Sequence, residues 1–250
     1  MVLDRWMSRP KVSAENQPAV NGFYREHIPN QFLARIGYWG MSKVVRVEAH
    51  YAGDAKAQIS EMWQYNPHVI LINNHTENMD AITVAGAAHS LPPLRRMRGK
   101  TDILAKHDIF ENPFQRRGVD VMGAIPTFRD GSPEDITNLM AYRMNKFGRY
   151  LAMDAEGKRN QGDTRQLLQF KYGVGYIACQ LSNDRPLVTL PAAISYGEGD
   201  NKDLHHAVMC FSEPVIGHPT DPIAYVERAQ AEVQKNLDWA FGFTDLRAAA

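Results

Sequence analysis

The chain has 250 residues, of which 44% are hydrophobic and 22% charged, which is ordinary for one large globular domain. Its formal net charge is zero, which argues against a nucleic-acid-binding protein with a basic surface. Cys179 and Cys210 lack the paired spacing of a metal or redox motif, so we expect free thiols in a reducing compartment. Because there is no membrane-span-length apolar stretch and residues 1–11 lack a secretory signal, we expect a cytoplasmic protein. A peripheral position on the inner membrane surface stays open.

The first part of the chain differs in character from the rest. Residues 1–22 are polar and without a clear period, which predicts a loose leader. Four apolar residues within 23–42 recur near helical spacing and predict an amphipathic helix. We expect this helix to pack on the core domain, with a bilayer interface as the alternative. The predicted division is a leader with a helical segment, 1–42, and an α/β domain, 43–250. The four apolar residues are Phe32, Leu33, Ile36 and Trp39.

Strand-like apolar runs then alternate with helical patterns. The predicted strands are 44–49, 69–73, 103–105, 119–125, 150–153, 187–194 and 207–211. The predicted helices are 54–65, a helix from about 80 that stops before the prolines at 92–93, 132–147, 164–178 and 222–241. This alternation predicts an α/β fold with a mixed, largely parallel sheet covered by helices on both faces.

Two of these helices carry recognisable start signals. Ser132 is a predicted N-cap with Pro133 as the first helical residue. Asp221 is the predicted N-cap of the last helix, whose apolar face should point inward. That face consists of Ile223, Val226, Val233, Leu237 and Ala240.

The strand at 69–73 runs into a polar turn that carries His75 and, five residues later, Asp80. On one continuous helix the two side chains would be about 140° apart, so they meet only if His75 lies in the loop and Asp80 in the first helical turn. Asp80 would then fix the tautomer of His75 and stabilise its imidazolium form. Because the turn holds no serine or cysteine, we predict a general base acting on a substrate hydroxyl.

Three further stretches hold candidate binding residues. Arg129 directly follows a predicted strand, and its guanidinium group could bind a phosphate through two parallel hydrogen bonds. Glu156 and Arg159 follow another strand, where Glu156 could accept from a substrate hydroxyl and Arg159 could bind phosphate. Residues 95–117 hold seven basic and three acidic side chains. This cluster is either a solvated face or a surface for anionic head groups or a nucleotide-bearing donor.

Two other enzyme classes are less favoured. Residues 173–178 have the form of a dinucleotide-binding loop but follow a helical pattern instead of a strand, which disfavours a nicotinamide or flavin enzyme. A metal-dependent hydrolase is the alternative from another class, although the tight ligand spacing of zinc sites is missing. Its ligands would be His75, Glu77 and Asp80 with a remote histidine such as His107 or His205.

Four blocks in a fixed order resemble the glycerolipid acyltransferases, the family of 1-acylglycerol-3-phosphate and glycerol-3-phosphate acyltransferases. Residues 74–80 (N-H-T-E-N-M-D) resemble the N-H-x₄-D block, and 123–129 resemble a glycine-led strand that ends in an arginine. Residues 154–159 (D-A-E-G-K-R) resemble the F-P-E-G-T-R block, and 190–194 (L-P-A-A-I) resemble the V-P-V-x-I block. Residues 170–178 resemble the family's F-K-x-G-x…A helix, which accounts for the glycines at this point.

The resemblance, which spans about 43–200, implies an O-acyltransferase. The implied reaction moves a fatty acyl group from acyl-CoA or acyl carrier protein to a hydroxyl of a lysophospholipid or glycerol phosphate, with no metal or other cofactor. His75 is the implied general base and Asp80 its orienter. Arg129 is the implied phosphate ligand, and the implied lining of the acceptor site is Glu156, Gly157 and Arg159.

The third block departs from the family pattern. Asp154 and Ala155 stand where the family has Phe-Pro, and Lys158 stands where it has threonine. These departures leave the acceptor open, with another lipid, a sugar or a polyketide hydroxyl as the alternative to a glycerophosphate-type lipid.

Overall fold

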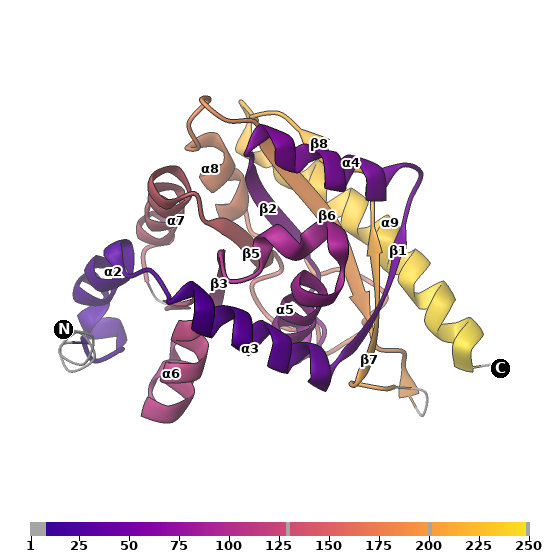
Figure 1. Cartoon of the computed structure of the whole chain (residues 1–250), viewed down its shortest axis with the longest axis horizontal. Coiled ribbons are helices and arrows are strands. Elements are labelled where there is room, and N and C mark those ends of the chain that lie inside the picture. The colour runs from indigo at the N-terminus through magenta and orange to yellow at the C-terminus, as the bar shows by residue number, and fades with distance from the viewer. Residues whose placement is uncertain (1–8, 129–130, 200–201, 249–250) are drawn as a thin grey trace.

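A computed structural model of the chain describes residues 9–128, 131–199 and 202–248. Its centre is an eight-stranded sheet of order β1-β7-β6-β2-β5-β3-β4, with β8 paired to β6 (Figure 1). The strands β6, β2, β5, β3 and β4 are parallel, whereas β7 and β8 run antiparallel to β6. The predicted mixed, largely parallel α/β sheet is therefore confirmed. The strands are β1 (Arg46–Tyr51), β2 (His68–Asn73), β3 (Thr101–Lys106), β4 (Ala124–Thr127), β5 (Tyr150–Asp154), β6 (Leu187–Ser195), β7 (His206–Phe211) and β8 (Val215–Ile216).

Helices cover both faces of this sheet. The α-helices are α2 (Gln17–Glu26), α3 (Gln31–Val44), α4 (Ala55–Glu61), α5 (Asp80–Ser90), α6 (Pro113–Val121), α7 (Pro133–Phe147), α8 (Gly173–Cys179) and α9 (Pro222–Ala248). Short 3₁₀ turns are η1 (Ala14–Asn16), η2 (Met62–Tyr65), η3 (Pro92–Met97) and η4 (His107–Phe110). Within the described ranges, no helix is long and apolar enough to cross a bilayer.

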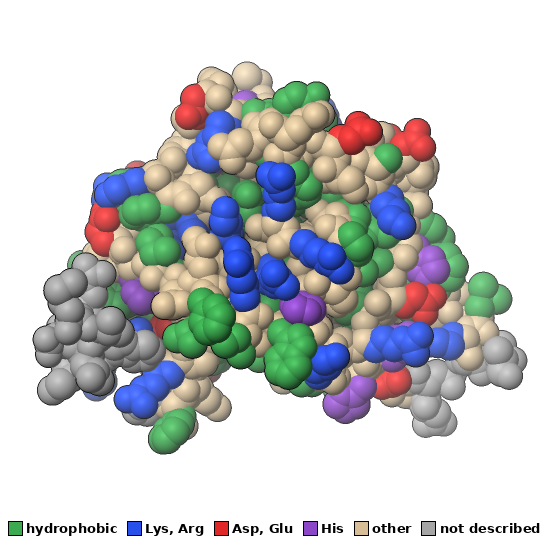
Figure 2. All heavy atoms as spheres, viewed as in Figure 1, with side chains coloured by type: hydrophobic (Ala, Val, Ile, Leu, Met, Phe, Trp, Pro, Cys, Tyr) green, Lys and Arg blue, Asp and Glu red, His purple; other side chains and the backbone are tan. Residues whose placement is uncertain are grey.

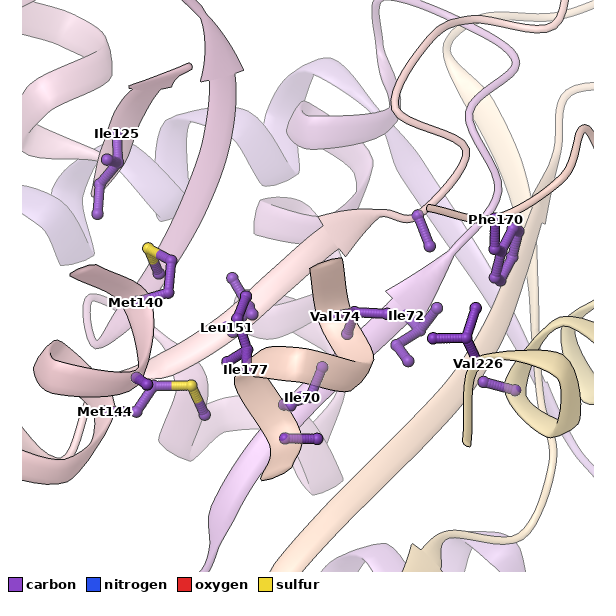
Figure 3. Packing of buried hydrophobic residues seen from close by; sticks show 14 of the residues in the cluster. Ile70, Ile72, Ile125, Met140, Met144, Leu151, Phe170, Val174, Ile177 and Val226 are labelled. Atoms are coloured by element: carbon purple, nitrogen blue, oxygen red, sulfur yellow. The ribbon is translucent and has the colours of Figure 1, made fainter. Parts of the chain in front are cut away.

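The hydrophobic core has two layers, one on each face of the sheet. The side chains of β2 contribute to both layers, because successive side chains of a strand point to opposite faces. Ile70 and Ile72 pack with α7, α8 and α9, and Figure 3 shows them beside Val226 and Leu151. Val69 and Leu71 pack on the other face. There the helices α3, α4 and α5 supply the partners. β2 is therefore buried on both faces, which accounts for its continuous apolar run.

The prediction of a loose leader over residues 1–22 is wrong for its second half, while residues 1–8 lie outside the described range. The helix α2 begins at Gln17, and Val20 and Tyr24 are buried in the core. Buried Arg143 donates hydrogen bonds to the carbonyl of Tyr24 and, at 2.7 Å, to that of His27. These long-range contacts hold a segment whose own sequence shows no clear period.

The predicted strand over 119–125 is wrong in its first half, where the chain forms the end of α6. The Asn112 side chain caps this helix by accepting from two backbone N–H groups of its first turn. The chain then turns at Gly123, whose φ of +88° favours glycine. A Cβ at Gly123 would also lie 2.2 Å from the carbonyl oxygen of Thr101. The strand β4 therefore starts only at Ala124.

Of the helix predicted over 164–178, only the last part is helical, as α8. Before it, backbone N–H groups donate to side chains from distant segments: Leu168 to Glu156 at 3.0 Å and Phe170 to Gln230 at 3.0 Å. The segment before α8 is not a strand either, as a dinucleotide-binding loop would require. A Cβ at Gly175 would lie 2.2 Å from the carbonyl oxygen of Pro222, so this glycine allows α8 to approach α9.

Both predicted helix starts are confirmed. Ser132 accepts from the N–H of Asp135 at 3.2 Å, and Asp221 accepts from that of Ile223 at 2.8 Å. The helix α9 extends beyond its predicted end to Ala248. Four of its five predicted inward residues are buried, but Ile223 is exposed at the first turn.

The helix predicted within 23–42 exists as α3 and does pack on the domain. It buries Ala34 and Tyr38, and its partner is α5. The apolar residues expected to make that contact lie instead on the opposite, exposed face. These are Phe32, Leu33, Ile36 and Trp39.

Candidate active site

The candidate residues gather where three central strands end. Because β2, β5 and β6 are parallel neighbours, their carboxyl ends meet at one edge of the sheet. His75 lies in the loop between β2 and α5, and Asp154 is the last residue of β5. This edge is where ligands commonly bind in open α/β sheets.

His75 and Asp80 lie on the two sides of the junction between this loop and α5. His75 Nδ1 lies 2.9 Å from Asp80 Oδ2, and Asp80 is the fully buried first residue of the helix. The same carboxylate oxygen accepts the backbone N–H groups of Thr76 at 2.8 Å and Glu77 at 2.9 Å. Asp80 therefore holds the turn in shape and orients the imidazole ring. His75 in the loop and Asp80 in the first turn of α5 is the arrangement in which the two side chains can cooperate.

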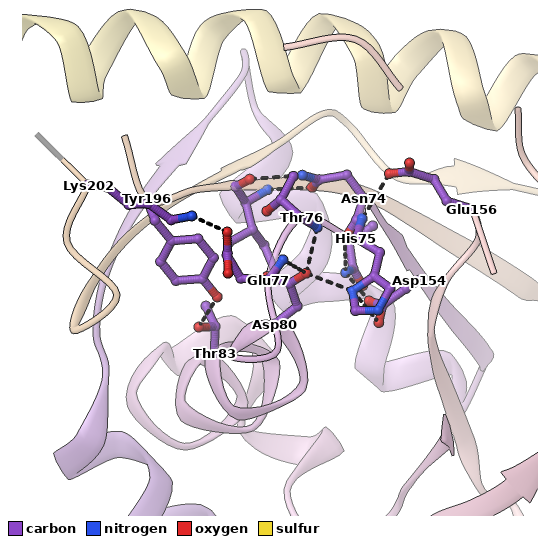
Figure 4. A network of polar contacts seen from close by, with 12 residues as sticks. Asn74, His75, Thr76, Glu77, Asp80, Thr83, Asp154, Glu156, Tyr196 and Lys202 are labelled. Carbon is purple, nitrogen blue, oxygen red and sulfur yellow. Dashed lines mark hydrogen bonds and ion pairs between the residues drawn. The ribbon is translucent and has the colours of Figure 1, made fainter. Parts of the chain in front are cut away.

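Four other hydrogen bonds fix the loop, and Figure 4 shows the residues around it. The Asn74 side chain donates to the carbonyl of Ile194 at 2.9 Å and accepts from the N–H of the same residue at 2.7 Å. The N–H of His75 donates to Glu156 at 2.9 Å, and the His75 carbonyl accepts from the N–H of Asn160 at 2.8 Å. The loop is thus tied to β6 and to the segment that follows β5.

Asp154 is a second acid beside the histidine, and sequence reasoning did not assign it to the site. Its Oδ2 lies 3.4 Å from His75 Nδ1, while its Oδ1 accepts from Asn73 Nδ2 at 2.6 Å. Asn73 and Asp154 are direct register partners at the ends of β2 and β5. The sequence signal was that Asn73 closes one predicted strand and Asp154 directly follows another, each beside a polar turn.

Burial and opposite charge compete at this site. Burial disfavours the imidazolium, but the hydrogen bond to Asp80 and the charges of Asp154 and Asp80 outweigh it, so the pKa of His75 is raised. Burial and the neighbouring charge of Asp80 raise the pKa of Asp154 to about 7. Burial also raises the pKa of Glu156, against the opposing effect of its backbone donors. The protonation of His75 therefore depends on that of Asp154, whose carboxylate lies 3.4 Å from the ring.

Glu156, which the resemblance implies as part of the acceptor site, accepts hydrogen bonds from protein backbone. It is buried, and one carboxylate oxygen accepts the N–H of His75 while the other accepts that of Leu168 at 3.0 Å. Both oxygens are thus used to hold protein backbone. Gly157 follows in a turn with φ of +69°, where its N–H donates to the carbonyl of Asp154.

A pocket of about 510 Å³ adjoins the loop. Arg159 lines it together with Thr76 and Glu77, and Lys202 lines it from the segment after β6. Lys202 forms an ion pair with Glu77. Arg129, the other predicted phosphate ligand, lies outside the described residues. The pocket thus brings Arg159 close to the His75 loop and adds Lys202, a cation that sequence reasoning missed.

Of the metal ligands that the sequence suggested, His75 and Asp80 meet, but Glu77, His107 and His205 do not join them in the part of the chain that the structure describes. Among the residues that the structure describes, the group with metal-ligand spacing is His75, Asp80 and Asp154, whose ligand atoms lie within 4.8 Å of one another. His205 Nδ1 contacts a backbone carbonyl 3.0 Å away, and His107 stacks on an aromatic ring.

Comparison with protein families gives an independent result. Residues 54–195, more than half of the chain, match the family described as Acyltransferase. The matched span begins before β2 and ends with the last residue of β6, so it includes His75, Asp80 and Arg159. No curated protein matches the chain.

Proposed function

The chain belongs to the acyltransferase family and is an acyltransferase, and from this premise we propose that it acylates a hydroxyl group of a glycerophosphate-type lipid, such as 1-acylglycerol-3-phosphate. The proposed donor is a fatty acyl thioester of coenzyme A or of acyl carrier protein. Such a reaction would serve phospholipid synthesis on the cytoplasmic side of the membrane.

One observation carries this proposal: His75 Nδ1 lies 2.9 Å from Asp80 Oδ2. Within the described chain, the other ring nitrogen, Nε2, makes no hydrogen bond or ion pair. The ring is partly exposed. A histidine held through Nδ1 by an acid can take a proton at Nε2.

The proposed chemistry uses the acceptor's own hydroxyl as the nucleophile. His75 Nε2 removes the hydroxyl proton as the oxygen attacks the thioester carbonyl, which forms a tetrahedral oxyanion. Collapse of this intermediate breaks the C–S bond, and the imidazolium donates its proton to the leaving thiolate. The products are the ester and the free thiol. Asp80 and Asp154 favour the transient imidazolium by their negative charge.

The pocket beside the loop supports a phosphorylated acceptor. We place the acceptor phosphate near Arg159 and Lys202, which both line this pocket. A guanidinium group binds phosphate with two parallel hydrogen bonds, whereas an ammonium acts as a point charge. Arg129 is the further proposed phosphate ligand. We propose that the reaction uses no metal or other cofactor, because a thioester is already activated.

A second acceptor class is favoured by one feature. Asp154 places a carboxyl group beside His75, and a carboxyl group can bind a neutral hydroxyl as a hydrogen-bond partner. The second candidate is therefore the same reaction on an unphosphorylated lipid, sugar or polyketide hydroxyl.

A release assay for free thiol tests both candidates. Purified protein is supplied with acyl-CoA or acyl-acyl carrier protein and with glycerol 3-phosphate, 1-acylglycerol-3-phosphate or the matching unphosphorylated monoacylglycerol. We expect turnover with a phosphorylated acceptor. Turnover with the monoacylglycerol alone would favour the second candidate, and activity lost on chelation would contradict cofactor-free chemistry.

A further inference from the structure

The exposed side of α3 carries an apolar row that the fold leaves unpartnered. The side chains repeat at positions that share one helix face, and each is between 44% and 71% exposed. The opposite side of the helix is buried against the domain through Ala34 and Tyr38. The row consists of Phe32, Leu33, Ile36 and Trp39.

The end of a basic segment packs on the N-terminal half of α3, next to this row. This segment includes η3 and ends at the turn around Gly99. A methyl group built on Gly99 would lie 3.2 Å from the carbonyl oxygen of Gln31 and 3.5 Å from Cγ of Arg35, so this turn packs on α3. On α3 itself, Lys43 Nζ lies 5.9 Å from the centre of the Trp39 ring. Two features that are 60 residues apart in sequence thus form one surface.

The cations of this surface are not neutralised. None of them forms an ion pair with any residue that the structure describes. Figure 2 shows Lys and Arg side chains gathered on the middle of the face that carries α3 in Figure 1, with Asp and Glu side chains toward its margins. The six cations are Arg35, Lys43, Arg95, Arg96, Arg98 and Lys100.

We propose that this α3–η3 face, the four apolar residues of α3 with these six cations, docks the protein on a bilayer that contains anionic lipid. The apolar row would enter the boundary between head groups and acyl chains, with α3 lying in the plane of the membrane. Trp39 suits this boundary because its ring is apolar at one end and polar at the other. The adjoining cations would meet phosphate and other anionic head groups.

The charge of the face selects a bilayer over a second copy of this chain. In a two-fold symmetric dimer the same patch meets itself. Six uncompensated cations on each copy would then face one another, and like charges across an interface oppose association. An anionic membrane instead complements both the apolar row and the cations. This docking is independent of the acceptor proposed above, since it concerns binding and not turnover.

Vesicle co-sedimentation of the full chain tests the proposal. We expect binding to vesicles of equimolar phosphatidylcholine and phosphatidylglycerol, weaker binding to phosphatidylcholine alone, and loss of binding as salt is raised. The double variant Phe32→Ala/Trp39→Ala should reduce binding to both vesicle types. Arg35→Glu/Arg95→Glu should reduce binding to the anionic vesicles by roughly tenfold or more, since each cation near the surface contributes several-fold.

Matched variants on other surfaces serve as controls. Ile216→Ala/Leu246→Ala removes two apolar side chains of similar exposure, 65% and 71%, and Arg228→Glu/Lys235→Glu makes the same change in net charge on α9. Both should bind vesicles like the unmodified protein. Equal losses in a control and its partner variant would overturn the proposal. The proposal would also be overturned if the protein bound no vesicles and instead formed a concentration-dependent dimer in analytical sedimentation. In that case Phe32→Ala/Trp39→Ala would abolish the dimer.

Discussion

Asp80 Oδ2 lies 2.9 Å from His75 Nδ1 across the junction between the β2–α5 loop and the first turn of α5. The same oxygen holds two backbone N–H groups of the loop. Any motion of the loop relative to the helix would therefore also turn the imidazole ring. This coupling makes the acid a positioning group for the proposed base, and it leads to the first prediction.

Asp80→Asn should lower kcat by about 10²–10⁴-fold, because the amide cannot stabilise the imidazolium and can hold the ring in the wrong tautomer. The KM values should change little. The measurement is steady-state thiol release, with circular dichroism to verify folding. Glu61→Gln, which alters an exposed acid in α4, should leave both constants unchanged. A change in KM with kcat intact would argue against an orienting role.

Asp154→Asn should shift the acid limb of the pH–rate profile to lower pH. The base must be neutral, so activity falls as the pH drops through the raised pKa of His75. Removing the negative charge of Asp154 makes the imidazolium less stable, which lowers that pKa. The amide oxygen can still accept from Asn73. An acid limb that stays in place, or moves to higher pH, would show that Asp154 does not act on His75.

Glu156→Gln should lower the free energy of unfolding by about 1–3 kcal/mol, since the amide nitrogen cannot accept a backbone N–H and leaves a buried donor unpaired. Denaturant titration measures this change. Glu227→Gln on the exposed side of α9 is the control. An unchanged stability together with a raised acceptor KM would instead support contact of Glu156 with the acceptor.

Arg159→Ala should raise the KM for a phosphorylated acceptor by roughly 10–100-fold, the value of a hydrogen bond to a charged group. The KM for the acyl donor should not change. Lys158→Ala removes the neighbouring exposed cation and should have little effect. If the donor KM rises instead, Arg159 binds the thioester carrier and the phosphate assignment is wrong.

The sequence predicted the local part of the site because that part depends on local geometry. The strand-to-helix order of this segment places His75 in the loop and Asp80 in the first helical turn. Because Asp80 comes five residues after His75, the two side chains can meet only in that arrangement. Asp154 depends on the register of β2 with β5, and no local pattern encodes that register. Its own chain position, at a strand end, indicated only that it would lie at the same edge of the sheet.

The errors in the fold have a common cause. Helical spacing showed that Phe32, Ile36 and Trp39 share a face, but which face of α3 is buried depends on where α5 lies. In the segment before α8, the backbone partner of Phe170 is Gln230, which is 60 residues further along the chain. Tertiary contacts of this kind override a local helical pattern.

The most direct test of the proposed mechanism is the rate of free-thiol release by His75→Ala with acyl thioester and phosphorylated acceptor. The base contributes about 10²–10⁴-fold to the rate, so the variant should lose at least that much activity while it remains folded. His205→Ala, which alters an exposed histidine, should retain full activity. Unchanged turnover by folded His75→Ala would contradict the account.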